Sequence, residues 1–194
     1  MQNDIIDLGI PFPKIKNHLN SGNRRSIFIS RQRMNSRRKG EINMSFEYDM
    51  DYRNYEWIDI ENHNDYLRLI QALKKKAKYI VIVKYDEYND EHIIQAKKSL
   101  ELIEKRRVTA YFSTVTGPPG YPEYIFKRPP NETEFFEYLK GFDTFFDRKK
   151  FGIDDIGFLN GRMKVLAYTV THEGLTGINK DFWKMINDGT YYMF

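Results

Sequence analysis

The sequence predicts an α+β fold in which three to four helices pack on a mainly antiparallel sheet. Several segments alternate apolar and polar residues or form short apolar runs, whereas others repeat apolar residues at helical spacing. Short polar turns join neighbouring strand segments, which favours hairpins over the long crossovers that a parallel sheet requires.

The length of 194 residues suits one domain. Pro11 and Pro13 exclude a continuous helix near the N-terminus, and a polar loop follows at 20–23. We therefore expect an irregular N-terminal arm over residues 1–23 and a single α+β domain over residues 24–194.

Residues 24–34 and 41–52 predict a first hairpin, connected by the polar turn NSRRKG. In the second segment every even position is apolar and every odd position is polar, as in a half-buried strand. We favour the register that buries Ile27 and Ile29, because burial of each side chain contributes roughly 1.5–3 kcal/mol. The alternative register gains only exposed ion pairs, worth less than about 1 kcal/mol.

The remaining chain mixes strands and helices. Strands are expected at 55–60, 79–83, 108–115, 121–127, 155–159 and 162–171, and helices at 65–77, 90–106, 132–148 and 180–188. The run YIVIV at 79–83 is apolar throughout, which is typical of a central strand covered on both faces. The pair Asn160-Gly161 predicts a two-residue type I′ turn between two strands.

The absence of cysteine excludes disulfides, thiolate catalysis, Cys-ligated zinc and iron–sulfur clusters. The acidic, proline-containing N-terminus is unlike a signal peptide, and no apolar run approaches the ~20 residues of a membrane span. We expect a cytoplasmic protein without membrane contact.

Positive charge is concentrated near the N-terminus. Residues 1–39 carry nine Lys and Arg against two Asp, whereas the remainder carries 22 basic and 25 acidic residues. In the favoured register, five cations gather at the hairpin tip, where they could bind the phosphates of nucleic acid. The candidates are Arg31, Arg33, Arg37, Arg38 and Lys39. The alternative is a solvated tip whose charges prevent aggregation.

Three carboxylates, those of Glu47, Asp49 and Asp51, share the polar face of the segment 41–52. A strand rise of ~3.3 Å per residue places neighbours about 6–7 Å apart. Such carboxylates could hold Mg²⁺ or Ca²⁺ and support a metal-dependent phosphodiesterase beside the arginines. The alternative is an ordinary solvated sheet face.

Other catalytic signals are weak. The four histidines show no HxxxH or HxH spacing, and the chain has neither a Walker loop nor GxGxxG. We therefore expect no cofactor.

The segment TVTGPPGYPEYIFK suggests a contact surface. Pro118, Pro119 and Pro122 are expected to stiffen an exposed loop that presents Tyr121 and Tyr124. Rigid aromatic side chains lose little entropy on binding, which suits contact with another protein. The alternative is a plain, rigid hairpin connection.

The sequence thus favours a cytoplasmic, non-enzymatic protein-interaction module, of the inhibitor or immunity type that binds another protein. The alternative is a nucleic-acid-binding protein, with or without metal-dependent phosphodiesterase activity, that uses the basic hairpin 24–40.

Overall fold

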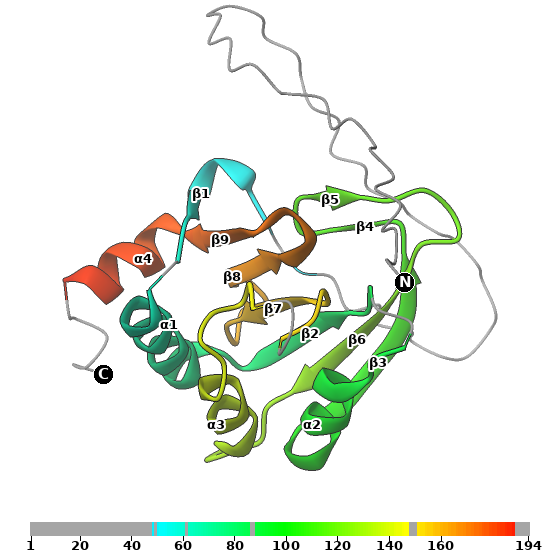
Figure 1. The fold of residues 1–194 in the computed structure, drawn as a ribbon, viewed down its shortest axis with the longest axis horizontal. Coiled ribbons are helices and arrows are strands. Elements are labelled where there is room, and N and C mark those ends of the chain that lie inside the picture. Colours follow the sequence, from blue (N-terminus) through cyan, green and yellow to red (C-terminus); the bar gives the residue numbers. More distant parts are fainter. Residues whose placement is uncertain (1–47, 49, 61, 86–87, 148–150, 189–194) are drawn as a thin grey trace, which may run out of the picture. The chain divides into compact units, whose positions relative to one another are not determined.

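A seven-stranded sheet organises the molecule, with the strand order β1-β9-β8-β7-β2-β6-β3 (Figure 1). Every neighbouring pair in this sheet is antiparallel. The computed structural model describes residues 48, 50–60, 62–85, 88–147 and 151–188, which all belong to one unit spanning residues 44–194. The predicted α+β class is confirmed. The predicted hairpin 24–52 and the arm 1–23 lie outside the described residues, except at the very end of the hairpin.

The strands of the main sheet are β1 (Tyr55–Ile58), β2 (Tyr79–Val83), β3 (Glu101–Val108), β6 (Tyr121–Lys127), β7 (Asp155–Leu159), β8 (Val165–Val170) and β9 (Leu175–Asn179). A separate two-stranded sheet consists of β4 (Ala110–Tyr111) and β5 (Thr114–Val115). The helices are α1 (His63–Lys76), α2 (Glu91–Ser99), α3 (Glu134–Lys140) and α4 (Lys180–Asn187). Short 3-10 turns occur at Tyr52–Asn54 and Thr171–Glu173. None of the helices in the described ranges is long and apolar enough to cross a membrane.

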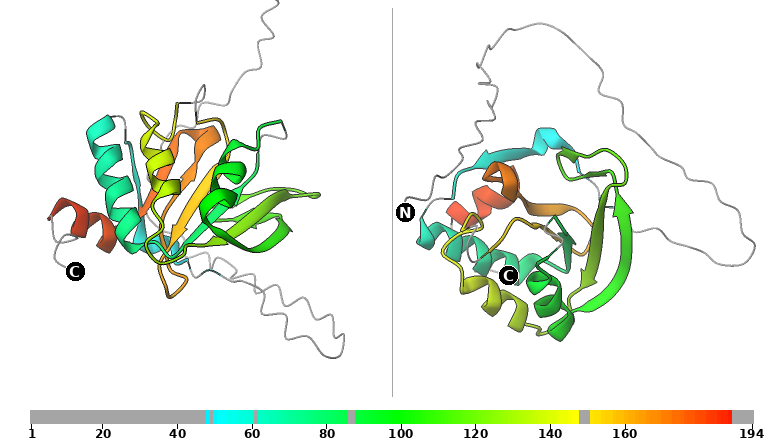
Figure 2. Two further views of the ribbon diagram at one scale, coloured as in Figure 1. Left: turned by 90° about the horizontal axis from the view of Figure 1, so that it is seen from below. Right: turned by 45° about the vertical axis from the view of Figure 1, so that its right-hand side comes forward.

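All four helices contribute to a core on one face of the sheet. Figure 2 shows α1, α3 and α2 in front of the strands, with α3 between the other two. Alternate residues of the central strand, Ile80 and Ile82, point into this core together with Phe126 and Phe158. The α1 helix begins where the Asn62 side chain accepts a hydrogen bond from the amide of Asp65 (2.8 Å).

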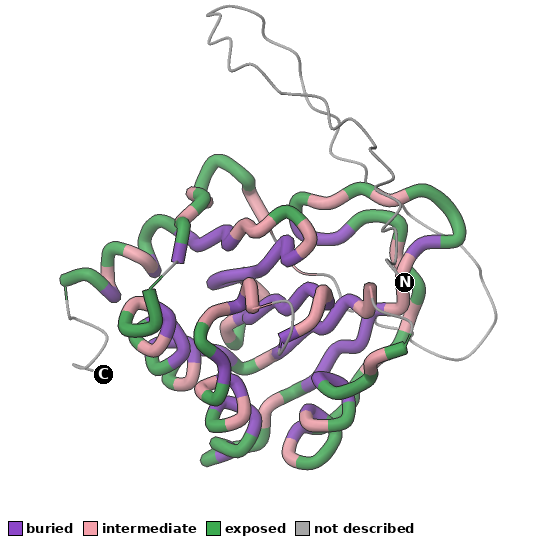
Figure 3. Tube along the Cα trace, in the orientation of Figure 1, coloured by how far each residue is buried: buried purple, intermediate pink, exposed green. Residues whose placement is uncertain are grey.

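A second core covers the opposite face of the sheet. Val81 and Val83 of β2 point into it, and Tyr111 of β4 and Phe112 of the following turn belong to the same core. Because cores cover both faces of the sheet, most residues of the central strands are buried, as the purple tube in Figure 3 shows. The prediction that the apolar run 79–83 is covered on both faces is therefore explained by two separate cores, each of which takes alternate residues of β2.

Two glycines let aromatic rings approach the strands closely on this second face. A Cβ at Gly157 would come within 2.0 Å of the Phe112 ring, and one at Gly177 within 2.3 Å of the Tyr168 ring. Phe112 and Tyr168 stack with ring centroids 5.1 Å apart. The glycines are therefore required for the close approach of these rings to the strands.

The predicted helix 90–106 is wrong in its second half. Helix α2 ends at Ser99, and residues 101–108 form β3, which pairs with β6. The charged residues of this segment carry no strong strand preference, so the pairing with β6 decides its conformation. A register shift between Leu102 and Glu104 also disturbs the two-residue alternation that would have indicated a strand.

Other boundaries differ for local reasons. The predicted strand 108–115 folds into the β4–β5 hairpin, with Phe112 at a φ of 43° in its turn. Helix α3 begins at Glu134 and ends at Lys140, so the predicted helix 132–148 is too long. The hairpin of β7 and β8 is confirmed, but Gly161 lacks the positive φ of a type I′ turn and β8 begins only at Val165. Strand β9 was not predicted.

The close approach of Phe112 to Gly157 predicts that Gly157→Ala lowers the free energy of unfolding by about 1–3 kcal/mol, because the added methyl group overpacks the second core. Urea denaturation monitored by tryptophan fluorescence would measure the change. Gly161→Ala is the control, since its Cβ would meet only Lys78 Cγ at an ordinary 3.6 Å. Equal stabilities of the two variants would contradict the packing argument.

Candidate functional site

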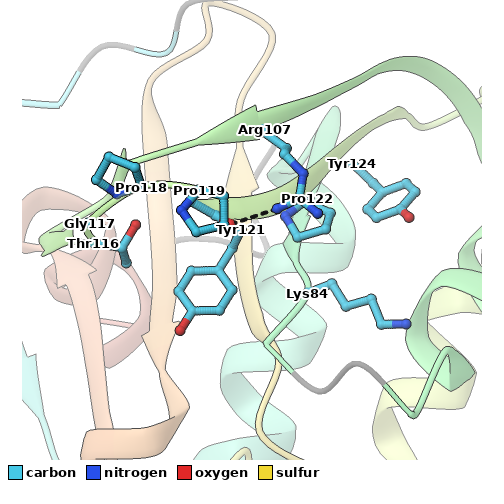
Figure 4. A pocket seen from close by; sticks show the side chains of 10 residues that line it. Lys84, Arg107, Thr116, Gly117, Pro118, Pro119, Tyr121, Pro122 and Tyr124 are labelled. Atoms are coloured by element: carbon cyan, nitrogen blue, oxygen red, sulfur yellow. Dashed lines mark hydrogen bonds between the residues drawn. The ribbon is translucent and has the colours of Figure 1, made fainter.

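A pocket of about 590 Å³ lies where β3 ends and β6 begins (Figure 4). Its lining consists of Lys84, Arg107, Thr116, Gly117, Pro118, Pro119, Gly120, Tyr121, Pro122 and Tyr124. Seven of these ten residues come from the continuous segment 116–122, so one proline-containing loop and the start of one strand form most of the pocket.

Backbone hydrogen bonds fix the loop that forms the wall. The Thr116 amide donates to the Thr109 carbonyl (2.7 Å), and the Gly120 amide donates to the Gly117 carbonyl (3.0 Å). Arg107 Nη1 donates to the Gly120 carbonyl (2.9 Å). Gly120 adopts a φ of 70°, and a Cβ there would lie 2.4 Å from the Val108 carbonyl oxygen, so only glycine fits. The wall is thus fixed by hydrogen bonds of its backbone groups, one of them from the Arg107 side chain, and by the glycine at position 120.

The two tyrosines predicted to contact a partner both line this pocket, but both belong to β6. Strand alternation directs their rings to opposite faces of the sheet, because Tyr121 packs against the second core and Tyr124 belongs to the core beneath the helices. Tyr121 stacks on Tyr85 with ring centroids 4.0 Å apart, and Tyr124 is only 8% exposed. The prediction that an exposed loop presents both rings is therefore wrong for Tyr124, which is packed in the core between the sheet and the helices. Their role in binding stays a prediction.

Positive charge accompanies the aromatic lining. Lys84 and Arg107 are the ionisable cations among the lining residues, and none of the ten carries a carboxylate. Lys105 lies next to them, with Nζ 5.0 Å from the centre of the Tyr124 ring. Lys84 forms an ion pair with Asp90 at the start of α2, and this hydrogen bond raises the pKa of Lys84. The lysine therefore remains charged at neutral pH.

A buried carboxylate fastens the hairpin from which the pocket wall continues. The Tyr111 hydroxyl donates to Asp155 Oδ2 (2.9 Å), and the Thr171 amide donates to Asp155 Oδ1 (2.6 Å). Asp155 is fully buried, and burial raises the pKa of its carboxyl to about 6, against the opposing effect of these donors. Tyr111 belongs to β4, so this contact ties the β4–β5 hairpin to β7.

A second buried carboxylate lies on the same face, since Glu123 and Asp155 both pair with Val83 across neighbouring strands. Glu123 accepts hydrogen bonds from Arg106 Nε (2.5 Å) and from the Tyr48 hydroxyl (3.0 Å). Burial raises the pKa of Glu123, and Arg106 opposes this shift. The two carboxylates thus hold residues from two covering segments, one at Tyr48 and one at Tyr111.

Of the predicted metal ligands, only Asp51 is described, whereas Glu47 and Asp49 lie outside the described residues. The Asp51 carboxylate binds Arg53 through Nε (3.0 Å) and Nη2 (2.8 Å) and caps the 3-10 turn Tyr52–Asn54. The predicted strand is wrong at this end, because Tyr48, Met50 and Asp51 belong to no strand. The part of the chain that the structure describes contains no group of three or more potential metal ligands.

The predicted nucleic-acid-binding residues also fall outside the described part of the chain. They are Arg31, Arg33, Arg37, Arg38 and Lys39. Conversely, sequence reasoning missed Lys84, Lys105 and Arg107 as site residues. Lys105 was assigned to the end of the predicted helix 90–106, where cations have an ordinary explanation in the helix dipole, and Arg107 fell between that helix and the predicted strand 108–115. Recognition of residues 101–108 as a strand antiparallel to 121–127 would have placed them beside the tyrosines.

Comparison with known proteins gives no further assignment: no protein-family model, curated protein or solved structure matches this chain.

The buried Asp155 predicts a pH dependence of stability. Its pKa is about 6 in the folded protein, above its ordinary value of 3.8, so the folded state binds this proton more tightly than the unfolded chain does. The contribution of Asp155 to the free energy of unfolding therefore decreases as the pH rises from about 4 to about 6, by at most about 3 kcal/mol.

Asp155→Asn removes this titration while it retains an acceptor for the Thr171 amide. We expect the stability of the native protein, relative to that of the variant, to fall between about pH 4 and about pH 7. Urea denaturation of both proteins at each pH measures this, and groups that titrate in both proteins cancel in the difference. A difference that is constant or increases with pH would contradict the assignment.

Proposed function

We propose that this protein is a cytoplasmic, non-enzymatic interaction module that binds a segment of another protein in the pocket beside β3 and β6. One observation carries the proposal: the lining combines two tyrosines, three prolines and an arginine around a wall that hydrogen bonds hold in place. Tyrosine and arginine are among the residues that contribute most to binding energy at protein interfaces.

The rigidity of the pocket supports this function on energetic grounds. Association costs conformational entropy for every side chain and loop that becomes ordered. Here Tyr121 is already held against Tyr85, and Tyr124 is already packed in the core. The loop 116–120 is closed by hydrogen bonds before any partner arrives. More of the contact energy is therefore available for affinity.

The chemistry of the lining also favours a peptide segment as the ligand. Aromatic and proline rings offer flat apolar surfaces for side chains, while Lys84 and Arg107 offer donors for carboxylates or carbonyl oxygens. A module of this kind acts by occupying its partner, which is the action of an inhibitor or an immunity protein. The nucleic-acid alternative depends on residues 24–40, outside the described part of the chain, and stays a prediction.

Gly117 provides a test that leaves the core intact. A Cβ at this position would have no atom within 4 Å, and the residue lies on the pocket wall. We expect Gly117→Trp to obstruct the pocket and to reduce the amount of a co-purifying partner by about tenfold or more, with unchanged melting temperature.

Gly117→Ala is the matched control and should retain the partner. The measurement is affinity purification of the tagged full chain from its native cells, followed by quantitative mass spectrometry. The proposal is wrong if both variants retain the same partners as the native chain, or if the native chain retains none.

A further inference from the structure

We propose that the partner segment is an acidic, extended strand that adds to the outer edge of β3 and places alternate side chains in the pocket. This inference rests on the proposed function and specifies the chemistry of the ligand. It depends on three properties of β3: its position at the end of the sheet, its alignment with the pocket, and the positive charges of Lys105 and Arg107 on one of its faces.

Strand β3 is the last strand of the sheet. Within the described ranges, β6 is its only partner, so the backbone groups on its outer side face no other described strand. Five of its eight residues are exposed, including Leu102 at 42% and Ile103 at 39%. An edge of this length can accept a further strand through main-chain hydrogen bonds, which is how several peptide-binding domains capture their ligands.

The C-terminal half of this edge is aligned with the pocket. Arg107 lines the pocket, and Lys105 lies over the ring of Tyr124, which also lines it. The side chains of Lys105 and Arg107 share one face of the sheet, because the two residues are two positions apart and both follow the register shift. An added strand would run about 4.8 Å from β3, so every second side chain of that strand would lie along Lys105, Arg107 and the pocket.

The charges at this edge select an acidic strand. Arg106 points to the other face, where Glu123 and Glu104 compensate it. In contrast, neither Lys105 nor Arg107 forms an ion pair with any residue that the structure describes. Opposite charges on neighbouring strands stabilise their pairing, whereas like charges oppose it. A strand with carboxylates at alternate positions therefore fits this edge, and a basic one does not.

Three synthetic peptides of about eight residues test the inference with the full chain. The first alternates Glu and Val, the second alternates Lys and Val, and the third is the Glu–Val peptide N-methylated at every residue, which removes all its backbone N–H donors. We expect the first to bind in fluorescence anisotropy, and the other two to bind at least about tenfold more weakly. Binding should also slow amide hydrogen exchange in residues 104–108.

The double variant Lys105→Glu/Arg107→Glu should lose the Glu–Val peptide and gain affinity for the Lys–Val peptide. Lys97→Glu/Lys98→Glu makes the same change of charge on the exposed side of α2 and should leave both affinities unchanged. Because the Lys–Val peptide reports a gain, the test does not depend on a loss that unfolding could also cause.

The inference is overturned if the Glu–Val peptide does not bind, if N-methylation has no effect, or if the two double variants behave alike. A dimer of the chain in sedimentation, dispersed by Lys105→Glu/Arg107→Glu, would assign the edge to a second copy and would also overturn it. If Gly117→Trp releases a natural partner that the Lys105→Glu/Arg107→Glu variant retains, the proposed function stands and only the acidic-strand inference fails.

Discussion

The hydrogen bond between the Tyr111 hydroxyl and the buried carboxylate of Asp155 is the constraint on which the second face of the sheet depends. It joins the β4–β5 hairpin to β7, while Phe112 fills the space left open by Gly157. A buried carboxylate without donors would be costly, so Asp155 is tolerable only because Tyr111 and Thr171 donate to it. The same contact therefore satisfies a buried polar group and positions the hairpin.

The position of the candidate pocket's wall depends on this attachment of the β4–β5 hairpin to β7. The loop 116–120 follows β5 directly. Its hydrogen bonds with Thr109 and Arg107 hold it beside the end of β3. The hairpin is thus fixed at one end by the second core and at the other by the edge of the sheet. Folding and proposed binding use different parts of this segment. The β4–β5 hairpin completes the second core, and the loop 116–120 forms the pocket wall.

Sequence reasoning succeeded where local pattern and tertiary environment agree. The apolar run 79–83 and the segment 121–127 match their strands, and the α+β class followed from such elements. It failed at residues 101–108, because a charged edge strand with a register shift has no two-residue period. It found Tyr121 and Tyr124 from the neighbouring prolines but missed Lys105 and Arg107, whose place in the site exists only through pairing with β6. Likewise, no local pattern shows that Asp155 would be buried under Tyr111, since that contact spans 44 positions in the chain.

The role of this hydrogen bond is tested most directly by amide hydrogen exchange in the full chain carrying Tyr111→Phe, which removes the hydroxyl and keeps the ring. We expect faster exchange in residues 109–120, which cover both the hairpin and the pocket wall, while β2 and the helices retain native protection. Protection unchanged at 109–120 would contradict the claim that this hydrogen bond holds the hairpin and, through it, the pocket.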